Sequence, residues 1–287
     1  MSSGRACGVA LAYARGELQF IGEWVDYHLT LGLSQLYVGV HVNEDLVPAA
    51  RHLTVKRPYA AMYEVGRSEA EVVAEFLDVL EPFGDRVATY LLHRDYSAEP
   101  DGHIATQERF YNAILGGRRS EFEWIAPFDI DEYLVPQPPY SSITAALDAV
   151  PADVAGVVME QVIATPRWDD DRRPRRGPLI VPELRRCSEV LPFGHGLKMF
   201  ARCRAAASLG LHEHQLVAGS GVLGDRRLLQ YHFRGFPEQT EETPYRTPVE
   251  RLEFDLVDRR PWELLEDARR RAAGPAGPER DDPAGRT

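Results

Sequence analysis

The sequence predicts an α/β fold: one domain with a mainly parallel, mixed central sheet and helices on both faces. Its 287 residues are enough to bury a full core. Short apolar runs alternate with helical patterns through the first half of the chain, as in successive βαβ units. A later apolar run passes directly into three acidic residues. Ligands of open α/β sheets bind beyond the carboxyl ends of the strands, so that position favours a binding site.

The first forty residues have the pattern of one βαβ unit. Residues 9–13 and 36–40 are short apolar runs, typical of buried strands. The helix between them follows Glu17 and ends at Gly32. The residues expected to face inward are Leu18, Ile21, Trp24, Val25, His28 and Leu29.

Two helices and a third strand are predicted next. A capping box at Ser68 starts the first helix, and residues 87–92 form the strand. Residues 104–115 then have a helical pattern that Gly116 and Gly117 are expected to stop.

Beyond residue 135 the predicted elements are shorter. We expect a helix at 141–150 and strands at 154–163, 197–203, 215–218 and 228–233. The charged, proline-rich segment 166–182 is predicted to be a long, solvated loop. An amphipathic helix begins at Pro261. The domain is expected to span 1–265, and 266–287 to form a disordered tail.

Composition limits the partners and the cellular location that we expect for the protein. The net charge of -11 argues against nucleic acid as the main partner, because phosphate backbones bind basic faces. Cys7, Cys187 and Cys203 match no zinc spacing and suggest a reducing compartment. We find no signal-peptide pattern and no run of about 18 apolar residues. A cytoplasmic location with at most peripheral membrane contact is therefore expected. Lys56 and Lys198 are the only lysines, which makes each of them informative.

The segment 124–134 is the centre of the prediction. A buried strand passes into Asp129, Asp131 and Glu132. In an extended chain the two aspartates point to the same side, about 6.5–7 Å apart. Carboxylates at that separation can share a hard divalent cation with the oxygens of a ligand. The alternative is a solvated acidic turn, because Asp-x-Asp triplets often occur by chance.

Several motifs resemble glycosyltransferase family 92 and related family-2-like glycosyltransferases, over residues 9–235. The resemblance rests on Arg15-Gly16-Glu17, Glu23-Trp24-Val25-Asp26-Tyr27-His28, Asn43, Asp45, Gln107, Tyr111, Asn112, Trp124, Phe128-Asp129-Ile130-Asp131-Glu132-Tyr133, Lys198, His212 and Tyr231-His232-Phe233. The chain departs from the family pattern at Gly16, where an Asn is usual, and at Phe233, where a Tyr is usual. A serine is missing from the turn around Asn43, and a Phe-Gly pair from the stretch near Ile163.

The resemblance implies a GT-A fold that binds a nucleoside-diphosphate sugar of UDP or GDP type. Residues 1–135 would bind the nucleotide, and 136–265 a glycan, lipid or natural-product acceptor. Mn²⁺ or Mg²⁺ would lie at the Asp-x-Asp motif, with Asp131 as ligand and Asp129 bound to the ribose or to the metal through water. Residues expected to contact the donor or metal are Tyr13, Arg15, Glu17, Asn43, Asp45, Gln107, Asn112, Lys198, His212 and His232.

Some of these residues have plainer interpretations. Asn43 and Asp45 could cap a turn, and Lys198 could be a surface charge rather than a cation for the diphosphate. His212, expected at the metal, could be a packed structural residue. Trp24 and His28 are predicted to be core residues that hold the first helix against the sheet.

The sequence does not identify the catalytic base. Inverting transfer needs a general base for the acceptor hydroxyl, and Glu160, Asp169 and Asp170 are the candidates; retaining transfer needs none. Two other function classes stay open. A nucleotidyltransferase or metal phosphohydrolase would show more metal-spaced acids or a glycine-rich phosphate loop, and we find neither. The Gly16 departure is also compatible with a non-catalytic domain that binds sugar or a partner.

Overall fold

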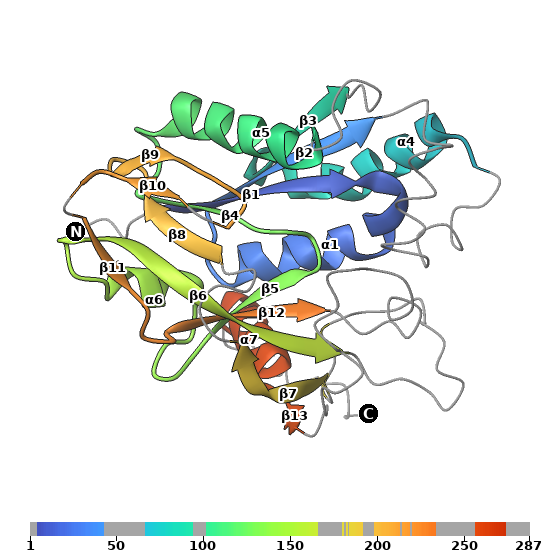
Figure 1. Cartoon of the computed structure of the whole chain (residues 1–287). Coiled ribbons are helices and arrows are strands. Elements are labelled where there is room, and N and C mark those ends of the chain that lie inside the picture. The colour runs from blue at the N-terminus through green and yellow to red at the C-terminus, as the bar shows by residue number, and fades with distance from the viewer. Residues whose placement is uncertain are drawn as a thin grey trace, which may run out of the picture.

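The computed structural model describes residues 5–42, 67–93, 102–165, 180, 182, 184–191, 198–212, 214–218, 220–233 and 256–273. Over these residues the predicted α/β fold is confirmed. A mixed sheet forms the centre, with helices on both of its faces (Figure 1). The sheet has a parallel half and a largely antiparallel half, and the chain passes from one to the other just after residue 127.

The parallel half has the strand order β3-β2-β1-β4. Its strands are β1 (Ala6–Tyr13), β2 (Gln35–Val42), β3 (Val87–His93) and β4 (Trp124–Pro127). All three neighbouring pairs are parallel, so the carboxyl ends of these strands share one edge. Residues that follow β1 and β4 therefore lie near each other, as the sequence predicted.

The second half continues the sheet beyond β4 with β8 (Lys198–Arg202) and β6 (Val154–Thr165), each antiparallel to its neighbour. The long strand β6 then pairs with both β7 (Leu184–Leu191) and β12 (Leu228–Phe233), and β12 also pairs with β5 (Glu132–Pro136). The remaining described strands are β9 (Ala206–Ser208), β10 (Gln215–Leu216), β11 (Gly221–Leu223) and β13 (Leu256–Asp258).

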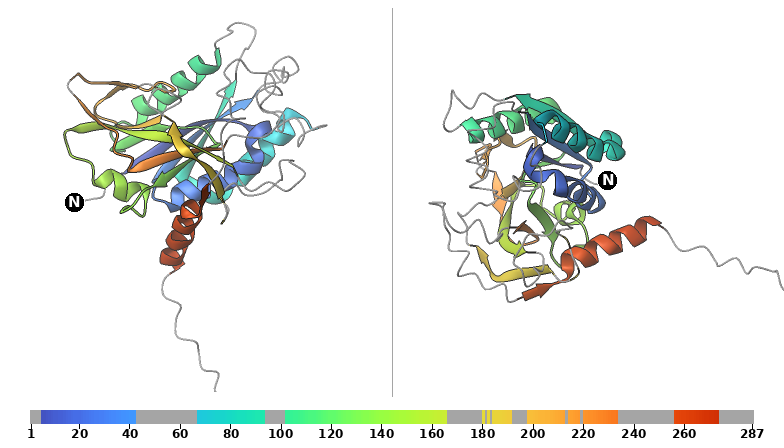
Figure 2. Two further views of the ribbon diagram at one scale, coloured as in Figure 1. Left: turned by 60° about the horizontal axis from the view of Figure 1, so that its bottom comes forward. Right: turned by 90° about the vertical axis from the view of Figure 1, so that its right-hand side faces the viewer.

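Three helices cover the two faces of the parallel half: α1 (Ala14–Thr30), α4 (Glu69–Leu80), which runs on into the 3-10 turn η1 (Glu81–Arg86), and α5 (Gly102–Arg118). The other two described helices are α6 (Ile143–Asp148), which contacts β5, and α7 (Arg260–Ala273), which contacts α1. One core joins Ala10 of β1 to Trp24 of α1 and Phe76 of α4, whereas a second core joins Val9 to Tyr111 of α5. Successive strand residues point to opposite faces, so α1 and α4 cover one face and α5 the other. Helix α7 lies on the side of the molecule opposite α5 (Figure 2).

Most predicted elements are confirmed, including the capping box at Ser68. Three boundaries are wrong. Helix α5 continues through Gly116 and Gly117 to Arg118. The strand expected at 215–218 is only the two-residue β10. Residues 266–273, assigned to the tail, belong to α7, and 274–287 lie outside the described residues. No helix in the described ranges has the length and apolarity needed to cross a bilayer.

Candidate functional site

The site is built on a tight turn between β4 and β5, residues Asp129–Glu132, which we term the acidic turn. The amide of Glu132 donates to the carbonyl of Asp129 at 3.1 Å, which closes the turn. The chain is therefore not extended between Asp129 and Asp131, and the spacing predicted for an extended strand does not apply. The turn follows directly on β4 and lies at the carboxyl edge of the parallel half, where ligands of such sheets bind.

Helix α1 holds the backbone of this segment through two side chains one helical turn apart. The indole Nε1 of Trp24 donates to two carbonyl oxygens, that of Asp129 at 3.1 Å and that of Glu132 at 3.0 Å. Two residues beyond the turn, the amide of Leu134 donates to Nε2 of His28 at 3.2 Å. Trp24 and His28 are fully buried, as predicted, but their polar atoms contact the acidic turn and β5.

The two hydrogen bonds of His28 define its tautomer. Its Nδ1 lies 2.8 Å from the carbonyl oxygen of Trp24, which can only accept, so Nδ1 carries the proton. Its Nε2 accepts from Leu134 and carries none. Burial lowers the pKa of His28 from 6.5 to about 3, against a smaller opposing effect of the Trp24 carbonyl. The ring is therefore neutral at physiological pH.

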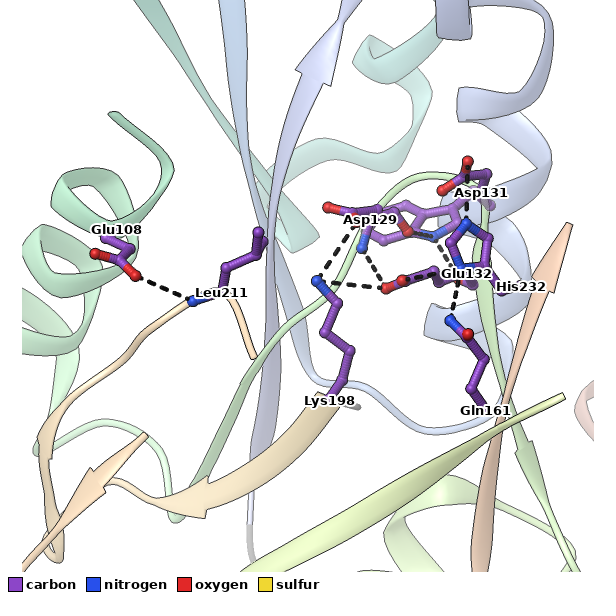
Figure 3. A network of polar contacts seen from close by, with 9 residues as sticks. Glu108, Asp129, Asp131, Glu132, Gln161, Lys198, Leu211 and His232 are labelled. Carbon is purple, nitrogen blue, oxygen red and sulfur yellow. Dashed lines mark hydrogen bonds and ion pairs between the residues drawn. The ribbon is translucent and has the colours of Figure 1, made fainter. Parts of the chain in front are cut away.

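Four strands bring polar side chains to the same face beside the acidic turn. Strand pairing sets Glu132 of β5 opposite His232 of β12, and Lys198 of β8 opposite Met159 of β6. Gln161 lies two residues beyond Met159 and therefore shares its face. Figure 3 shows Lys198, His232 and Gln161 all pointing toward the acidic turn. Strand register thus assembles the cluster from segments far apart in the sequence.

Lys198 is a buried cation shared by two carboxylates. Its Nζ lies 3.4 Å from Oδ2 of Asp129 and 3.8 Å from Oε2 of Glu132, and its side chain is 0% exposed (Figure 3). The same Oε2 of Glu132 accepts a hydrogen bond from the amide of Asp129 at 2.8 Å. The alternative interpretation of Lys198 as a surface charge is wrong, and its predicted role at a diphosphate stays a prediction.

His232 lies between two of the acids. Its Nε2 is 3.6 Å from Oδ2 of Asp131, and its Nδ1 is 3.6 Å from Oε1 of Glu132. The side-chain amide of Gln161 lies 2.6 Å from the same Nδ1. His232 therefore joins the acidic turn to β6 and β12 (Figure 3).

Burial separates the three acids. The side chains of Asp129 and Asp131 are 24% and 13% exposed, whereas that of Glu132 is 1% exposed. Desolvation raises the pKa of Glu132 from 4.5 to about 8, even though Lys198 lowers it, and the two aspartates raise it further. Burial disfavours the charged form of Lys198, but Asp129 and Glu132 outweigh that effect and raise its pKa. Of these three acids, Asp129 and Asp131 are the two that keep exposed side-chain surface.

Of the candidate catalytic bases, the structure describes Glu160 but not Asp169 or Asp170. Glu160 points to the opposite face of β6 from Gln161, and its Oε2 pairs with Nε of Arg226 at 2.7 Å. Asp169 lies outside the described residues, as do Asn43 and Asp45.

Other residues expected to contact the nucleotide lie in β1, α1 and α5. Tyr13 is the last residue of β1, Arg15 lies in the first turn of α1, and Glu17 is buried one turn into that helix. These three lie at the same edge of the sheet as the acidic turn. Gln107 is buried in α5.

Asn112 and His212 lie on the α5 side of the sheet. The amide group of Asn112 donates to the carbonyl of Leu209 at 2.8 Å and accepts from the amide of Leu209 at 2.9 Å, so it ties the loop after β9 to α5. His212 is exposed in that loop, next to Leu211, whose amide donates to Glu108 of α5 (Figure 3).

Two members of the cluster were missed or undervalued from sequence. Gln161 has no motif of its own, and only its register opposite Gln230 shows that it faces the site. From sequence, Glu132 could either support the two aspartates from behind or be the first residue outside the site. Its signal was its position as the first residue of an apolar run, Tyr133-Leu134-Val135, which forms the buried strand β5.

No protein-family model matches the chain, and no curated protein is detectably similar to it. Among solved structures, the mannosyltransferase PcManGT from Pyrobaculum calidifontis, in complex with GDP-Man and Mn²⁺, has a TM-score of 0.32 and 16% identity, over 56% of this chain and 36% of that one. HddC from Yersinia pseudotuberculosis has a TM-score of 0.32 and 7% identity, over 79% and 92%. This chain therefore spans about a third of the mannosyltransferase, and neither likeness is close enough to support an argument about function.

Proposed function

We propose that this protein is a metal-dependent glycosyltransferase that moves a sugar from a nucleoside-diphosphate donor to an acceptor hydroxyl. The observation that supports this best is the acidic turn itself. Asp129 and Asp131 are partly exposed at the carboxyl edge of a parallel sheet, and Lys198 and His232 converge on them from the second half of the chain. The family motifs in the sequence fall on the same residues.

The donor set suits a hard divalent cation. Mg²⁺ and Mn²⁺ prefer carboxylate oxygens, and Mg²⁺ is commonly held by one or two carboxylates together with substrate phosphates and water. Within the described ranges, no group of three or more His, Cys, Asp and Glu side chains is arranged to hold a metal. In our proposal, Asp131 and Asp129 supply the protein ligands, and the diphosphate the others.

When bound, such a cation would act as a Lewis acid that stabilises the charge on the departing diphosphate. The protein's own residues have supporting tasks. Lys198 limits the repulsion between Asp129 and the buried Glu132, and His232 lies against Asp131. Of the three catalytic bases proposed from sequence, Glu160 faces away from the acidic turn, and Asp169 and Asp170, which lie outside the described residues, stay our candidates if transfer inverts configuration.

The test is a thermal-shift titration with UDP or GDP, with and without Mn²⁺. A ligand that binds only the folded state raises its stability, by about 2.7 kcal/mol at a concentration 100 times Kd. We expect a nucleotide-dependent rise in Tm that requires Mn²⁺, and we expect Asp131→Ala to abolish it while the fold is kept. Asp153→Ala, at an exposed acid before β6, is the matched control and should respond like the wild type.

Other outcomes separate the alternatives. If Asp131→Ala retains the Mn²⁺-dependent shift, the proposed site is wrong. Release of phosphate from a nucleotide without any acceptor would instead support a phosphohydrolase. If no nucleotide changes Tm, a non-catalytic binding domain is favoured.

A further inference from the structure

The acidic turn needs support from groups outside it. The turn places carboxylates at positions 129, 131 and 132, and these repel one another. Two of its carbonyl groups have backbone donors: that of Asp129 accepts from the amide of Glu132 at 3.1 Å, and that of Asp131 from the amide of Phe233 in β12 at 2.9 Å. A buried carbonyl without a donor costs about 1–3 kcal/mol. Because the carboxylates repel one another, further hydrogen bonds from outside the turn are needed to hold its backbone in one conformation.

The single indole N–H of Trp24 is shared between the carbonyl groups at the two ends of the turn. Its Nε1 lies 3.1 Å from the carbonyl oxygen of Asp129 and 3.0 Å from that of Glu132, residues more than a hundred positions away in the chain. Because one rigid indole contacts the first and the last residue of the turn, it fixes the distance between them. The direction of both aspartate side chains depends on that backbone.

The indole itself packs against two aromatic rings. Its ring lies 5.0 Å from the ring of Phe128 and 4.8 Å from that of His28, centroid to centroid. Phe128 in turn fills the space beside Gly8 of β1, where a Cβ atom would come within 2.7 Å of the phenyl ring. His28 continues the support, since it accepts from Leu134 and donates to the carbonyl of Trp24.

We infer that Trp24, supported by His28, is the positioning residue of the acidic turn. By donating from α1 to the backbone carbonyls of the turn, it orients the side chains of Asp129 and Asp131 toward the ligand. Trp24 is 0% exposed and cannot touch a ligand itself, so it acts only through the turn. The part of this inference that concerns a cation rests on the proposed function. The part that concerns the turn does not.

The primary test is amide hydrogen exchange of the full chain without added ligand. Trp24→Phe removes the N–H and retains an aromatic ring between Phe128 and His28. We expect faster exchange confined to residues 129–134. The matched control is Trp124→Phe, at another buried tryptophan, whose ring lies under the guanidinium of Arg202 at 4.2 Å. It should leave exchange of 129–134 unchanged. Equal exchange in Trp24→Phe and wild type, or a uniform rise over the whole chain, would overturn the inference.

The second test measures Mn²⁺ affinity by electron paramagnetic resonance, with GDP or UDP present. Groups that orient metal ligands typically change metal affinity about 10–100-fold. We expect Trp24→Phe to weaken Mn²⁺ binding about tenfold or more and Trp124→Phe to leave it unchanged. If the wild type binds no Mn²⁺, the proposed function fails, and the exchange experiment still decides the role of Trp24.

A pair of variants at His28 keeps the inference testable if Trp24→Phe does not fold. Gln can present an acceptor to the amide of Leu134, whereas Leu cannot. His28→Leu should therefore raise exchange at 129–134, and His28→Gln should restore much of the protection. Equal exchange in the two variants would count against the positioning role.

Discussion

At the scale of single residues, the acidic turn shows how burial assigns different tasks to neighbouring acids. Asp129 and Asp131 keep part of their surface, whereas Glu132 is enclosed by Lys198, His232 and the amide of Asp129. Burial raises the pKa of Glu132 to about 8. A group whose pKa is raised in the folded state loses its contribution to stability as the pH rises toward that value. Glu132 therefore favours the folded state most at acidic pH.

The contribution of His28 to stability depends on pH in the opposite direction, and this gives a testable prediction. Its pKa is about 3 in the folded protein and 6.5 ordinarily, so the unfolded state binds the extra proton as the pH falls below 6.5. The stability that His28 contributes is present above that pH and is lost toward pH 3, at about 1.4 kcal/mol per pH unit. Between pH 7 and pH 5, the wild type should lose about 2 kcal/mol more of its free energy of unfolding than His28→Gln, which does not titrate.

Urea unfolding at pH 7, 6 and 5 measures this difference. Glu132 is present in both proteins, so its own slope cancels in the comparison. Parallel pH profiles of the two proteins would show that His28 is protonated in the folded state, contrary to its hydrogen bonds with Trp24 and Leu134.

At the scale of elements, periodicity predicted the helices and most of the strands, because those signals are local. Trp24 and His28 were predicted to be buried, and they are. The end of α5 was wrong, since two glycines were read as a stop. Both glycines are exposed, and a Cβ on either would meet no atom within 4 Å, so the helix tolerates them without needing them.

This exposed pair of glycines gives a second prediction. Glycine in a helix costs roughly 0.5–1 kcal/mol relative to alanine, and less in a final turn. Gly116→Ala and Gly117→Ala should each raise the free energy of unfolding by about 0.5 kcal/mol, measured by thermal or urea unfolding. The contrasting control is Gly32→Ala, because Gly32 has a φ of +108° and lies against Thr144, so alanine there should destabilise. A loss of stability in the two α5 variants would indicate that the helix ends before Gly116.

Strands that depend on distant partners were harder to predict. Strand β5 begins at the last residue of the acidic turn, so its apolar run was read as part of that acidic segment. Strand β13 has three residues, two of them exposed and apolar, which gives no clear strand pattern. The same limit applies to the site. The sequence indicated Asp129, Asp131, Lys198 and His232, but Gln161 reaches His232 only through the pairing of β6 with β12. Long-range register leaves no local pattern.

At the scale of the whole molecule, the site joins the two halves of the sheet. Trp24 and the aspartates come from the parallel half and its edge, whereas Lys198, Gln161 and His232 come from the second half. Any motion of one half relative to the other would therefore change distances within the site. The C-terminal strand β13 contacts β12 through the hydrogen bond from Tyr231 to Asp258.

Asp258 is the centre of that C-terminal support, and it carries the last prediction. Its Oδ2 accepts from Nε of Arg186 in β7 and from the hydroxyl of Tyr231 in β12, both at 2.6 Å. Its Oδ1 accepts from the amide of Arg260 at the start of α7, at 2.9 Å. Asp258→Ala leaves a partly buried guanidinium and a buried hydroxyl without this partner, so we expect the free energy of unfolding in urea to fall by about 2 kcal/mol or more.

The control is Arg271→Ala, at an exposed position of α7, which should change the free energy of unfolding by less than about 0.5 kcal/mol. Because Tyr231 adjoins His232 on β12, Asp258→Ala should also speed amide exchange around His232. An effect on stability no larger than that of Arg271→Ala would instead mean that α7 is held by its apolar residues Leu264 and Leu265.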